Sequence, residues 1–301
     1  MSAHIGSTPS VDFPIQTPEI LKYPRTPHLE GSRLQPGDEG HEQVRLATLA
    51  GRHAVIEEKL DGANVGISFT SGGDMLLQSR GHYLGGGGRE RQFGPFKRWA
   101  SAHEARLLGL LEDRYVMYGE WLYAKHSVSY DCLPHWFCEF DIYDRVERLF
   151  LSTPRRQAML AGSPIVSVPV LQTGALPRDA KALRALVRPS LAKSAQWRDT
   201  FEQGVRQQQL DLALAWRQTD KSDLSEGLYI KVEDEHQVLG RYKWVRPDFV
   251  QTILDSGSHH STRPVIPNGL APAADLYAPQ ATAGWPVPPN MALVAPSRRS
   301  T

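Results

Sequence analysis

Lys59 is the residue of this chain best placed to act as a nucleophile. It lies in the run EEKLDGAN, which spans residues 57–64. Apolar residues at 55–56 and 65–69 predict a buried hairpin around a tight turn. Burial lowers the pKa of a lysine and leaves a neutral amine, which is the form that attacks an electrophile. The spacing therefore predicts a lysine nucleophile beside a buried turn, with Asp61 on the same face of the strand.

Four later runs also place charged residues among apolar and aromatic ones. They are YGEW at 118–121, FCEFDIY at 137–143, SEGLYIK at 225–231 and RYKW at 241–244. A carboxylate between aromatic residues of a strand is costly to bury unless it is paired or used. These runs therefore predict strands that carry charged side chains into a shared site.

The elements that would position these residues follow from apolar spacing. Short apolar runs predict strands at 115–118, 136–143 and 165–171. Apolar residues at helical spacing predict an amphipathic helix over 96–111, a helical segment over about 179–214 interrupted by Pro189, and a last helix that starts at Trp244.

Composition divides the chain into three parts. Residues 1–21, rich in Ser and Pro, predict a flexible N-terminal arm, and residues 255–301, rich in Pro and Ala, predict a C-terminal extension over the surface. Residues 22–254 form the expected folded domain. The four glycines at 85–88 predict a mobile loop; a phosphate-binding loop stays open as the alternative, although a P-loop lysine and serine are absent.

The overall charge is nearly balanced, with 34 basic and 33 acidic residues and a formal net charge of +1. Binding of a nucleic acid would therefore need a local basic cluster. Residues 80–98 provide one, and a solvated loop anchored by aromatic residues explains the same pattern. The cluster consists of Arg80, Arg89, Arg91, Lys97 and Arg98 with Phe93, Phe96 and Trp99.

Cysteine usage and hydropathy exclude some classes of protein. Cys132 and Cys138 have no second pair, which excludes a disulfide framework and a four-cysteine zinc site. The sequence has neither a signal-like start nor an apolar run long enough to span a bilayer. We therefore expect a cytoplasmic, reduced protein with no membrane partner.

The five runs, in this order, resemble the conserved blocks of covalent nucleotidyltransferases, the superfamily of polynucleotide ligases and capping enzymes. They extend from Lys59 to about Arg246, with Lys-x-Asp-Gly at 59–62 as the first block. Asn64 stands where DNA ligases and capping enzymes usually carry arginine, whereas RNA ligases of the type that seals nicks in double-stranded RNA carry asparagine. The resemblance is therefore to an ATP-dependent RNA ligase.

This resemblance implies an adenylyltransferase domain of the α+β class, with two antiparallel sheets around the nucleotide and helices outside. It implies ATP and Mg²⁺ or Mn²⁺ as cofactors. Lys59 would attack the α-phosphorus of ATP and hold AMP covalently. AMP would then pass to an RNA 5′-phosphate, and the RNA 3′-hydroxyl would displace it.

The resemblance also assigns residues to the adenosine part of ATP. Glu58 would accept a hydrogen bond from the adenine amino group, which favours ATP over GTP. Phe140 would stack on adenine, with Phe137 as the competing ring. Glu120 would bind the ribose hydroxyls, and Asp61 would orient the amine of Lys59 or help to hold the ribose.

Basic and acidic residues are assigned to phosphate and metal. Glu226 and Lys231 lie five apart, so a regular strand would place them on opposite faces and a bulge would be needed to bring both to the nucleotide. The expected phosphate-binding residues are Arg80, Lys231, Arg241 and Lys243, and the expected metal ligands are Asp141 and Glu226.

Other functions fit the same scaffold. A DNA ligase or a capping-type guanylyltransferase is the nearest alternative, and a catalytically silent nucleotide- or RNA-binding module is an alternative from another class. The expected partners are broken or nicked RNA ends, with an end-healing kinase or phosphatase as a further partner. The sequence leaves the oligomeric state open, and it assigns no role to the helical insert at 179–214.

Overall fold

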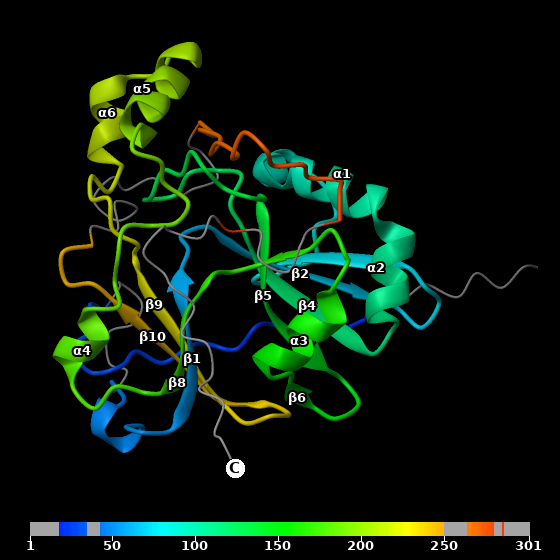
Figure 1. Cartoon of the computed structure of the whole chain (residues 1–301). Helices are drawn as coiled ribbons and strands as arrows, with labels where there is room; N and C mark the ends of the chain where they lie inside the picture. The colour runs from blue at the N-terminus through cyan, green and yellow to red at the C-terminus, as the bar shows by residue number, and fades with distance from the viewer. Residues whose placement is uncertain (1–17, 35–42, 250–263, 280–284, 286–301) are drawn as a thin grey trace, which may run out of the picture.

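Two β-sheets lie next to each other in the molecule, with helices around them (Figure 1). The computed structural model describes residues 18–34, 43–249, 264–279 and 285. The observed class is α+β, and two antiparallel sheets are present as expected.

The first sheet has four antiparallel strands in the order β10-β9-β1-β8. In its centre, β1 pairs with β9 in a regular register that sets Lys59 opposite Gly227. The strands are β1 (His53–Lys59), β8 (Val170–Ala175), β9 (Gly227–Glu233) and β10 (Val238–Val245).

The second sheet has the order β3-β2-β4-β5-β6, and the short β7 pairs with β5 in parallel. The register of β2 against β4 sets Asn64 opposite Glu120. The strands are β2 (Ala63–Phe69), β3 (Met75–Ser79), β4 (Tyr115–Trp121), β5 (Phe137–Asp144), β6 (Leu149–Phe150) and β7 (Val166–Ser167).

The hairpin expected around Lys59 is wrong, because β1 and β2 belong to different sheets. The turn at 60–62 carries the chain from one sheet to the other. Gly62 is required there, since a Cβ at this position would lie 2.6 Å from the carbonyl oxygen of Trp121. As a result Lys59 and Asn64, five residues apart, face each other from two sheets.

The helix expected over 96–111 is two helices, α1 (Gly94–Ala102) and α2 (Glu104–Leu111), which break at His103. Both cover the second sheet (Figure 1). Phe96 and Trp99 of α1 pack on Trp121 and Phe137 of the sheet. A third helix, α3 (Thr153–Leu160), follows β6, and short 3-10 helices cover Leu46–Thr48 (η1) and Gly88–Phe93 (η2).

The insert expected over 179–214 is made of three short helices. Asp179 and Asp211 cap two of them through bonds from the backbone N–H groups of Ala182 and Leu214, both 2.8 Å long. The helices are α4 (Ala180–Arg184), α5 (Trp197–Gln207) and α6 (Leu212–Arg217). The chain between α4 and α5 is not helical, because it runs back along the first sheet and the cavity described below.

The helix expected to start at Trp244 is absent from the described residues. Trp244 and Val245 instead complete β10, because both side chains are buried beside the first sheet. The remainder of that expected helix, residues 250–254, lies outside the described residues.

Part of the expected C-terminal extension packs on the body of the protein. We call residues 264–279 the C-terminal strap. Asn268 of the strap donates to the carbonyl oxygen of Leu122 over 2.7 Å and accepts from the N–H of Tyr130 over 2.9 Å. Residues 255–263, 280–284 and 286–301 lie outside the described residues, as do residues 1–17 of the expected N-terminal arm.

Buried charges join the two sheets, and we call them the inter-sheet network. Arg156 of α3 lies 2.9 Å from Glu57 of β1 and 2.6 Å from Glu139 of β5. Lys231 of β9 lies 3.0 Å from Glu57 and 3.2 Å from Asp141 of β5. All five side chains are at most 1% exposed, so each charge depends on its partners for the solvation that water would give.

Within the described part of the chain, none of the helices is long and apolar enough to cross a bilayer. Cys132 and Cys138 are both free thiols.

Replacing Arg156 with Met should lower the free energy of unfolding by about 3–5 kcal/mol, because it leaves Glu57 and Glu139 buried without their guanidinium partner. The control is Arg155→Met on the same helix, where the side chain is 33% exposed and 3.7 Å from Glu147. The control should change the free energy by less than about 1 kcal/mol. Urea unfolding followed by circular dichroism measures both; equal losses would mean that burial of this pair has no special importance.

Candidate active site

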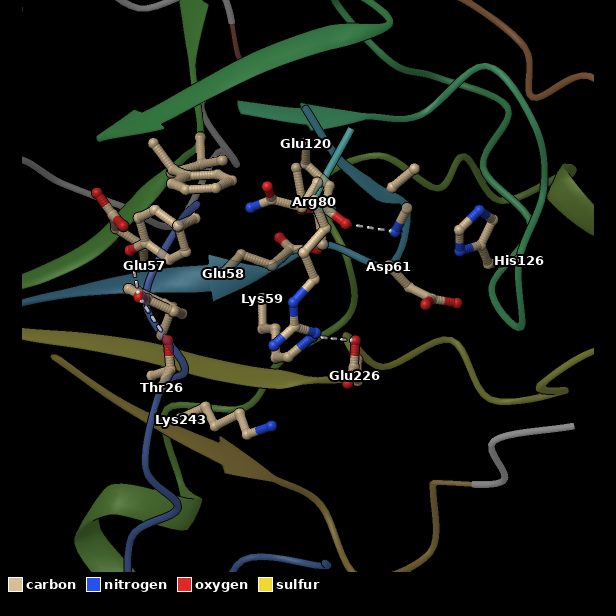
Figure 2. A pocket seen from close by; sticks show the side chains of 18 of the residues that line it. Thr26, Glu57, Glu58, Lys59, Asp61, Arg80, Glu120, His126, Glu226 and Lys243 are labelled. Atoms are coloured by element: carbon tan, nitrogen blue, oxygen red, sulfur yellow. Dashed lines mark hydrogen bonds and ion pairs between the residues drawn. The ribbon is translucent and has the colours of Figure 1, made fainter. Parts of the chain in front are cut away.

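A cavity of about 520 Å³ opens between the two sheets, and both sheets contribute to its wall (Figure 2). β1 and the turn after it supply residues 57–62, and β2, β4 and β5 supply the opposite side. Most residues expected to bind a nucleotide are brought together here. They are Glu58, Lys59, Asp61, Asn64, Arg80, Glu120, Phe140, Glu226 and Lys243.

Lys59 ends β1, and its Nζ lies 2.7 Å from Oε2 of Glu226. The Lys59 side chain is 22% exposed, whereas Glu226 is 1% exposed, so the amine faces the cavity and the carboxylate lies behind it. Gly227, the first residue of β9, lets β10 pass close to this point, since a Cβ there would lie 2.0 Å from the carbonyl oxygen of Trp244. Glu226 precedes β9, so the alternation of side chains along a strand does not apply to it. It therefore reaches the cavity without the expected bulge in β9.

The pKa of Lys59 is raised, which contradicts the sequence-based expectation of a lowered one. Burial alone lowers the pKa of this amine, but the negative charges of Glu226, Glu120 and Asp61 outweigh burial. Without a nucleotide the amine is therefore held as an ammonium ion. The positive charge has to be released before the nitrogen lone pair can attack.

Asp61 and Glu120 fix the backbone around the turn. Oδ2 of Asp61 accepts the backbone N–H groups of Ser127 and Val128 at 2.7 and 2.8 Å, which places His126 at the cavity wall. Oε1 of Glu120 accepts the N–H of Gly62 at 2.9 Å. Burial raises the pKa of Glu120 to about 8, against the opposing effect of the nearby Lys59 ammonium.

Glu58 connects the cavity to the chain that leads into the helical insert. Its Oε1 accepts the hydroxyl of Ser190 at 2.5 Å, and its Oε2 accepts the N–H of Leu191 at 3.1 Å. Burial raises the pKa of Glu58 to about 7, although both hydrogen bonds oppose this shift. Each carboxylate oxygen has a further lone pair, so the group can still accept from a ligand donor.

Asn64 offers a hydrogen-bond acceptor that the protein does not use. Its Oδ1 is buried and has no hydrogen-bond partner among the described residues. A buried polar atom without a partner costs free energy, so a ligand that donates a hydrogen bond here would be stabilised. Arg80 lies at the same cavity and is exposed.

Phe140 lies at the cavity because β5 contains a bulge. Tyr118 and Gly119 of β4 pair with Asp141 and Glu139, which leaves Phe140 without a partner in the ladder. The competing ring, Phe137, is fully buried on the other side of the sheet, where it packs against α1. The structure therefore leaves Phe140 as the ring that can contact a nucleotide.

Lys231, Asp141 and Arg241 do not lie on the cavity wall, and their expected contacts with phosphate and metal stay predictions. Asp141 is fully buried between Lys231 and the hydroxyl of Tyr23, and the positive charges of Lys231, Arg156 and Arg241 lower its pKa against the effect of burial. Arg241 stacks on Phe150, 3.7 Å from the ring centre. Tyr23 separates these groups from the cavity.

Residues that sequence reasoning missed also line the cavity. Glu57 could have been found, because strand alternation puts it on the face of Lys59, and Tyr229 could have been found in the same way from Lys231. Tyr23 comes from a distant segment, and its hydroxyl lies 2.6 Å from that of Tyr229. No local signal predicted this contact. Further lining residues are Pro24, Thr26, Leu60, Gly62, Ala63, Ser79, Gln92, Phe93, His126 and Val168.

A divalent metal fits the cavity through one carboxylate, Glu226. The described residues contain no cluster of three or more His, Cys, Asp or Glu side chains suited to a metal. Mg²⁺ is commonly held by one or two carboxylates together with substrate phosphates and water. Asp141 does not fit this role in the observed arrangement, because its carboxylate is enclosed by Lys231 and Tyr23.

The arrangement suits attack by an amine on a phosphate ester. The Lys59 amine faces the cavity, Lys243 and Arg80 supply positive charge at the wall, and Glu226 can take up a proton.

The chain was compared with protein-family models, curated proteins and solved structures. The model of the RNA ligase family matches residues 52–245. Three structures of the Naegleria gruberi RNA ligase are similar to this chain: a glutamate-to-alanine mutant with ATP and Mn, an arginine-to-alanine mutant with ATP and Mn, and a complex with PPi. In that order, the sequence identities are 17%, 16% and 17%, and the TM-scores are 0.48, 0.47 and 0.45. The matches cover 76%, 77% and 75% of this chain and 56%, 57% and 56% of the ligase chain. The matches span little more than half of that ligase. No curated protein matches.

Replacing Glu226 with Gln should lower the pKa of Lys59, because the closest charge that holds the ammonium is removed. Competitive acylation with a limiting amount of reagent, read by mass spectrometry across pH, measures this pKa. Glu235→Gln, at an exposed site remote from Lys59, is the control. An unchanged titration of Lys59 in Glu226→Gln would contradict the assigned ion pair.

The free energy of unfolding should fall between about pH 5 and 8. The pKa of Glu120 is about 8 in the folded protein against an ordinary 4.5, so the folded state holds more protons than the unfolded chain in this window. Stability then decreases as the pH rises. Glu120→Gln should make the slope less steep, whereas Glu235→Gln should not. Urea titrations at several pH values measure the slope, and an identical slope in Glu120→Gln would refute the raised pKa.

Proposed function

The chain belongs to the RNA ligase family, and we propose that it joins RNA 3′-hydroxyl and 5′-phosphate ends in an ATP-dependent reaction. The observation that carries this proposal is the amine of Lys59 on the wall of a nucleotide-sized cavity, 2.7 Å from Glu226. The cavity is enclosed by two sheets, which suits a reaction that must keep water from a reactive phosphate.

Lys59 is the proposed nucleophile of the first step. Its nitrogen attacks the α-phosphorus of ATP, a P–N bond forms, and the bond to pyrophosphate breaks. The amine must first lose a proton. Glu226 is its hydrogen-bond partner, but a carboxylate that holds the metal does not keep a proton, so the proton passes on to water. Because three carboxylates raise the pKa of Lys59, nucleotide binding has to change this balance before attack.

The adenosine part of ATP is proposed to lie between Phe140 and the strand that carries Glu58. The carboxylate of Glu58 accepts from the exocyclic amine of adenine, for which guanine offers a keto oxygen instead. The orphan Oδ1 of Asn64 and the carboxylate of Glu120 face the same space and suit hydroxyl donors such as those of ribose.

The phosphates are proposed to meet Lys243 and Arg80 at the cavity wall. Lys231 and Arg241 would reach a phosphate only if the ring of Tyr23 moves, because Tyr23 lines the cavity and lies against Asp141 and Arg241. Mg²⁺ or Mn²⁺, held by Glu226 and the phosphates, would neutralise phosphate charge.

The later steps use the same site. AMP passes from Lys59 to the 5′-phosphate of RNA, which converts that phosphate into an activated anhydride. The 3′-hydroxyl of the other end then attacks the activated phosphate, and AMP leaves with the electron pair of the broken bond. We also propose that the substrates are the ends of nicked or broken RNA, and that a kinase or phosphatase prepares these ends for sealing.

Incubation with [α-³²P]ATP and Mg²⁺ should label the wild-type protein, and Lys59→Ala should abolish the label because it removes the nitrogen that forms the bond. Lys221→Ala, at an exposed lysine, should retain it. The adduct should be labile in acid and stable in alkali, as a phosphoramidate is. Loss of sealing in Lys59→Ala should exceed about 10⁴-fold, on the scale of losing a nucleophile.

Substrate comparisons separate the alternatives. Labelling by GTP rather than ATP would favour a capping-type enzyme, and sealing of nicked DNA but not of nicked or single-stranded RNA would favour a DNA ligase. Wild-type protein that binds ATP without forming any adduct would be a silent binding module and would overturn the proposal.

A further inference from the structure

The basic cluster at residues 80–98 separates into two layers in the structure. Its aromatic residues, Phe93, Phe96 and Trp99, are buried and anchor η2 and α1 to the second sheet. Its arginines Arg80, Arg91 and Arg98 are exposed. The remaining members are Lys97, which lies 2.5 Å from Glu90, and Arg89, whose side chain lies outside the described residues.

A second, smaller cavity lies beside this arginine layer, and we call it the aromatic slot. It has a volume of about 70 Å³. Pro95 and Arg98 of α1 form one side, Trp121 and Trp136 lie on the sheet side, and Tyr277 of the C-terminal strap forms the rim. Tyr277 is 54% exposed, so part of its ring is open to a ligand.

The tryptophans of the aromatic slot present rings rather than N–H donors. The indole N–H of Trp99 is bonded to the carbonyl of Leu276 at 2.8 Å, and that of Trp136 to the carbonyl of Asn268 at 3.0 Å. Trp121 donates to the carbonyl of Gln92 at 2.7 Å. Trp99 and Trp121 are 2% and 1% exposed, so the aromatic surface open at the slot comes from Tyr277 and the half-buried Trp136, with the guanidinium of Arg98 beside them.

The slot and the main cavity lie on two sides of the same turn. Gln92 and Phe93 line the main cavity, while Pro95 and Arg98 line the slot. Trp121, which lines the slot, donates its indole N–H to Gln92. The segment from Gln92 to Arg98 therefore lines both the main cavity and the slot.

We propose that the aromatic slot holds one unpaired base of the RNA strand whose end enters the main cavity, with Arg91 and Arg98 on its phosphates. This rests on the proposed function. Unpaired RNA bases stack on aromatic rings and guanidinium planes, and exposed arginines neutralise the backbone. The exposed guanidiniums have no carboxylate partner in the described part of the chain, so their charge is available to a polyanion.

The experiment uses Arg98→Ala and Tyr277→Ala, which are both exposed sites outside the nucleotide cavity. The matched controls are Arg217→Ala on α6 and Leu239→Ala on β10, which are exposed and remote from the slot. Labelling by [α-³²P]ATP reports the first chemical step alone. Sealing of pre-adenylylated RNA and fluorescence anisotropy with labelled RNA report RNA binding.

Both slot variants should retain labelling by ATP and should lose about tenfold in RNA affinity, on the scale of one stacked base. For Arg98→Ala the slope of log affinity against log salt should fall by about 0.7, as expected when one phosphate contact to a single strand is lost. In RNAs that carry 2-aminopurine at successive positions near the end, the wild type should quench the 2-aminopurine fluorescence at one of these positions. Tyr277→Ala should remove this quenching.

Other outcomes overturn the inference. If both variants bind and seal RNA as the controls do, the slot is not an RNA site. If affinity falls without quenching at any position, the arginines bind phosphate and the base-stacking role is wrong. Failure of the proposed function itself would look different, because the wild type and every variant would then lack the ATP label.

Discussion

The inter-sheet network is the constraint on which the rest of the structure depends. A cavity between two sheets survives only if the sheets are held together away from it. Here Arg156 joins Glu57 of the first sheet to Glu139 of the second, and Lys231 of the first sheet pairs directly with Asp141 of the second. Such charges are expensive to remove from water, so the geometry that satisfies them leaves little freedom in how the sheets approach. The network thus fixes the width of the cavity.

The register of the first sheet sorts its charged residues into rows at increasing depth. Lys59 and Gly227 form the row at the cavity, and Glu57 and Tyr229 form the next. Lys231 lies one row deeper, beside Arg241 of β10. The rows explain why residues of one sequence block have different surroundings: Glu226 touches the amine of Lys59, while the lysine five residues later is enclosed.

The sequence predicted much of the site but not how its parts are joined. The blocks around Lys59, Glu120 and Glu226 are local patterns, and the structure brings them together. The hairpin was wrong because apolar alternation identifies strands without saying which sheet each one joins. The pKa direction of Lys59 was wrong because it depends on carboxylates from three separate segments. Tyr23, which covers the deeper cations, comes from a segment with no signal of its own.

Elements that position residues rather than contact them were the hardest to foresee. Ser190 holds Glu58 although it lies more than a hundred residues away, and its sequence context is that of an ordinary loop. The bulge that turns Phe140 toward the cavity shows in the pairing of β4 with β5 and not in the composition of either strand. Such contacts are set by tertiary packing, which no local propensity encodes.

The C-terminal strap lies beyond the last residue of the family match, yet it closes the protein on the side of Leu122 and Tyr130. Tyr130 in turn supports the turn after Lys59, because its hydroxyl oxygen accepts the backbone N–H of Asp61 at 2.8 Å. A fragment that ends at the last residue of the family match would therefore lack the strap residues that hold Tyr130, and with it the turn after Lys59. The bounds of a family match show which residues are similar among family members, and they do not show which residues this protein needs for a complete fold.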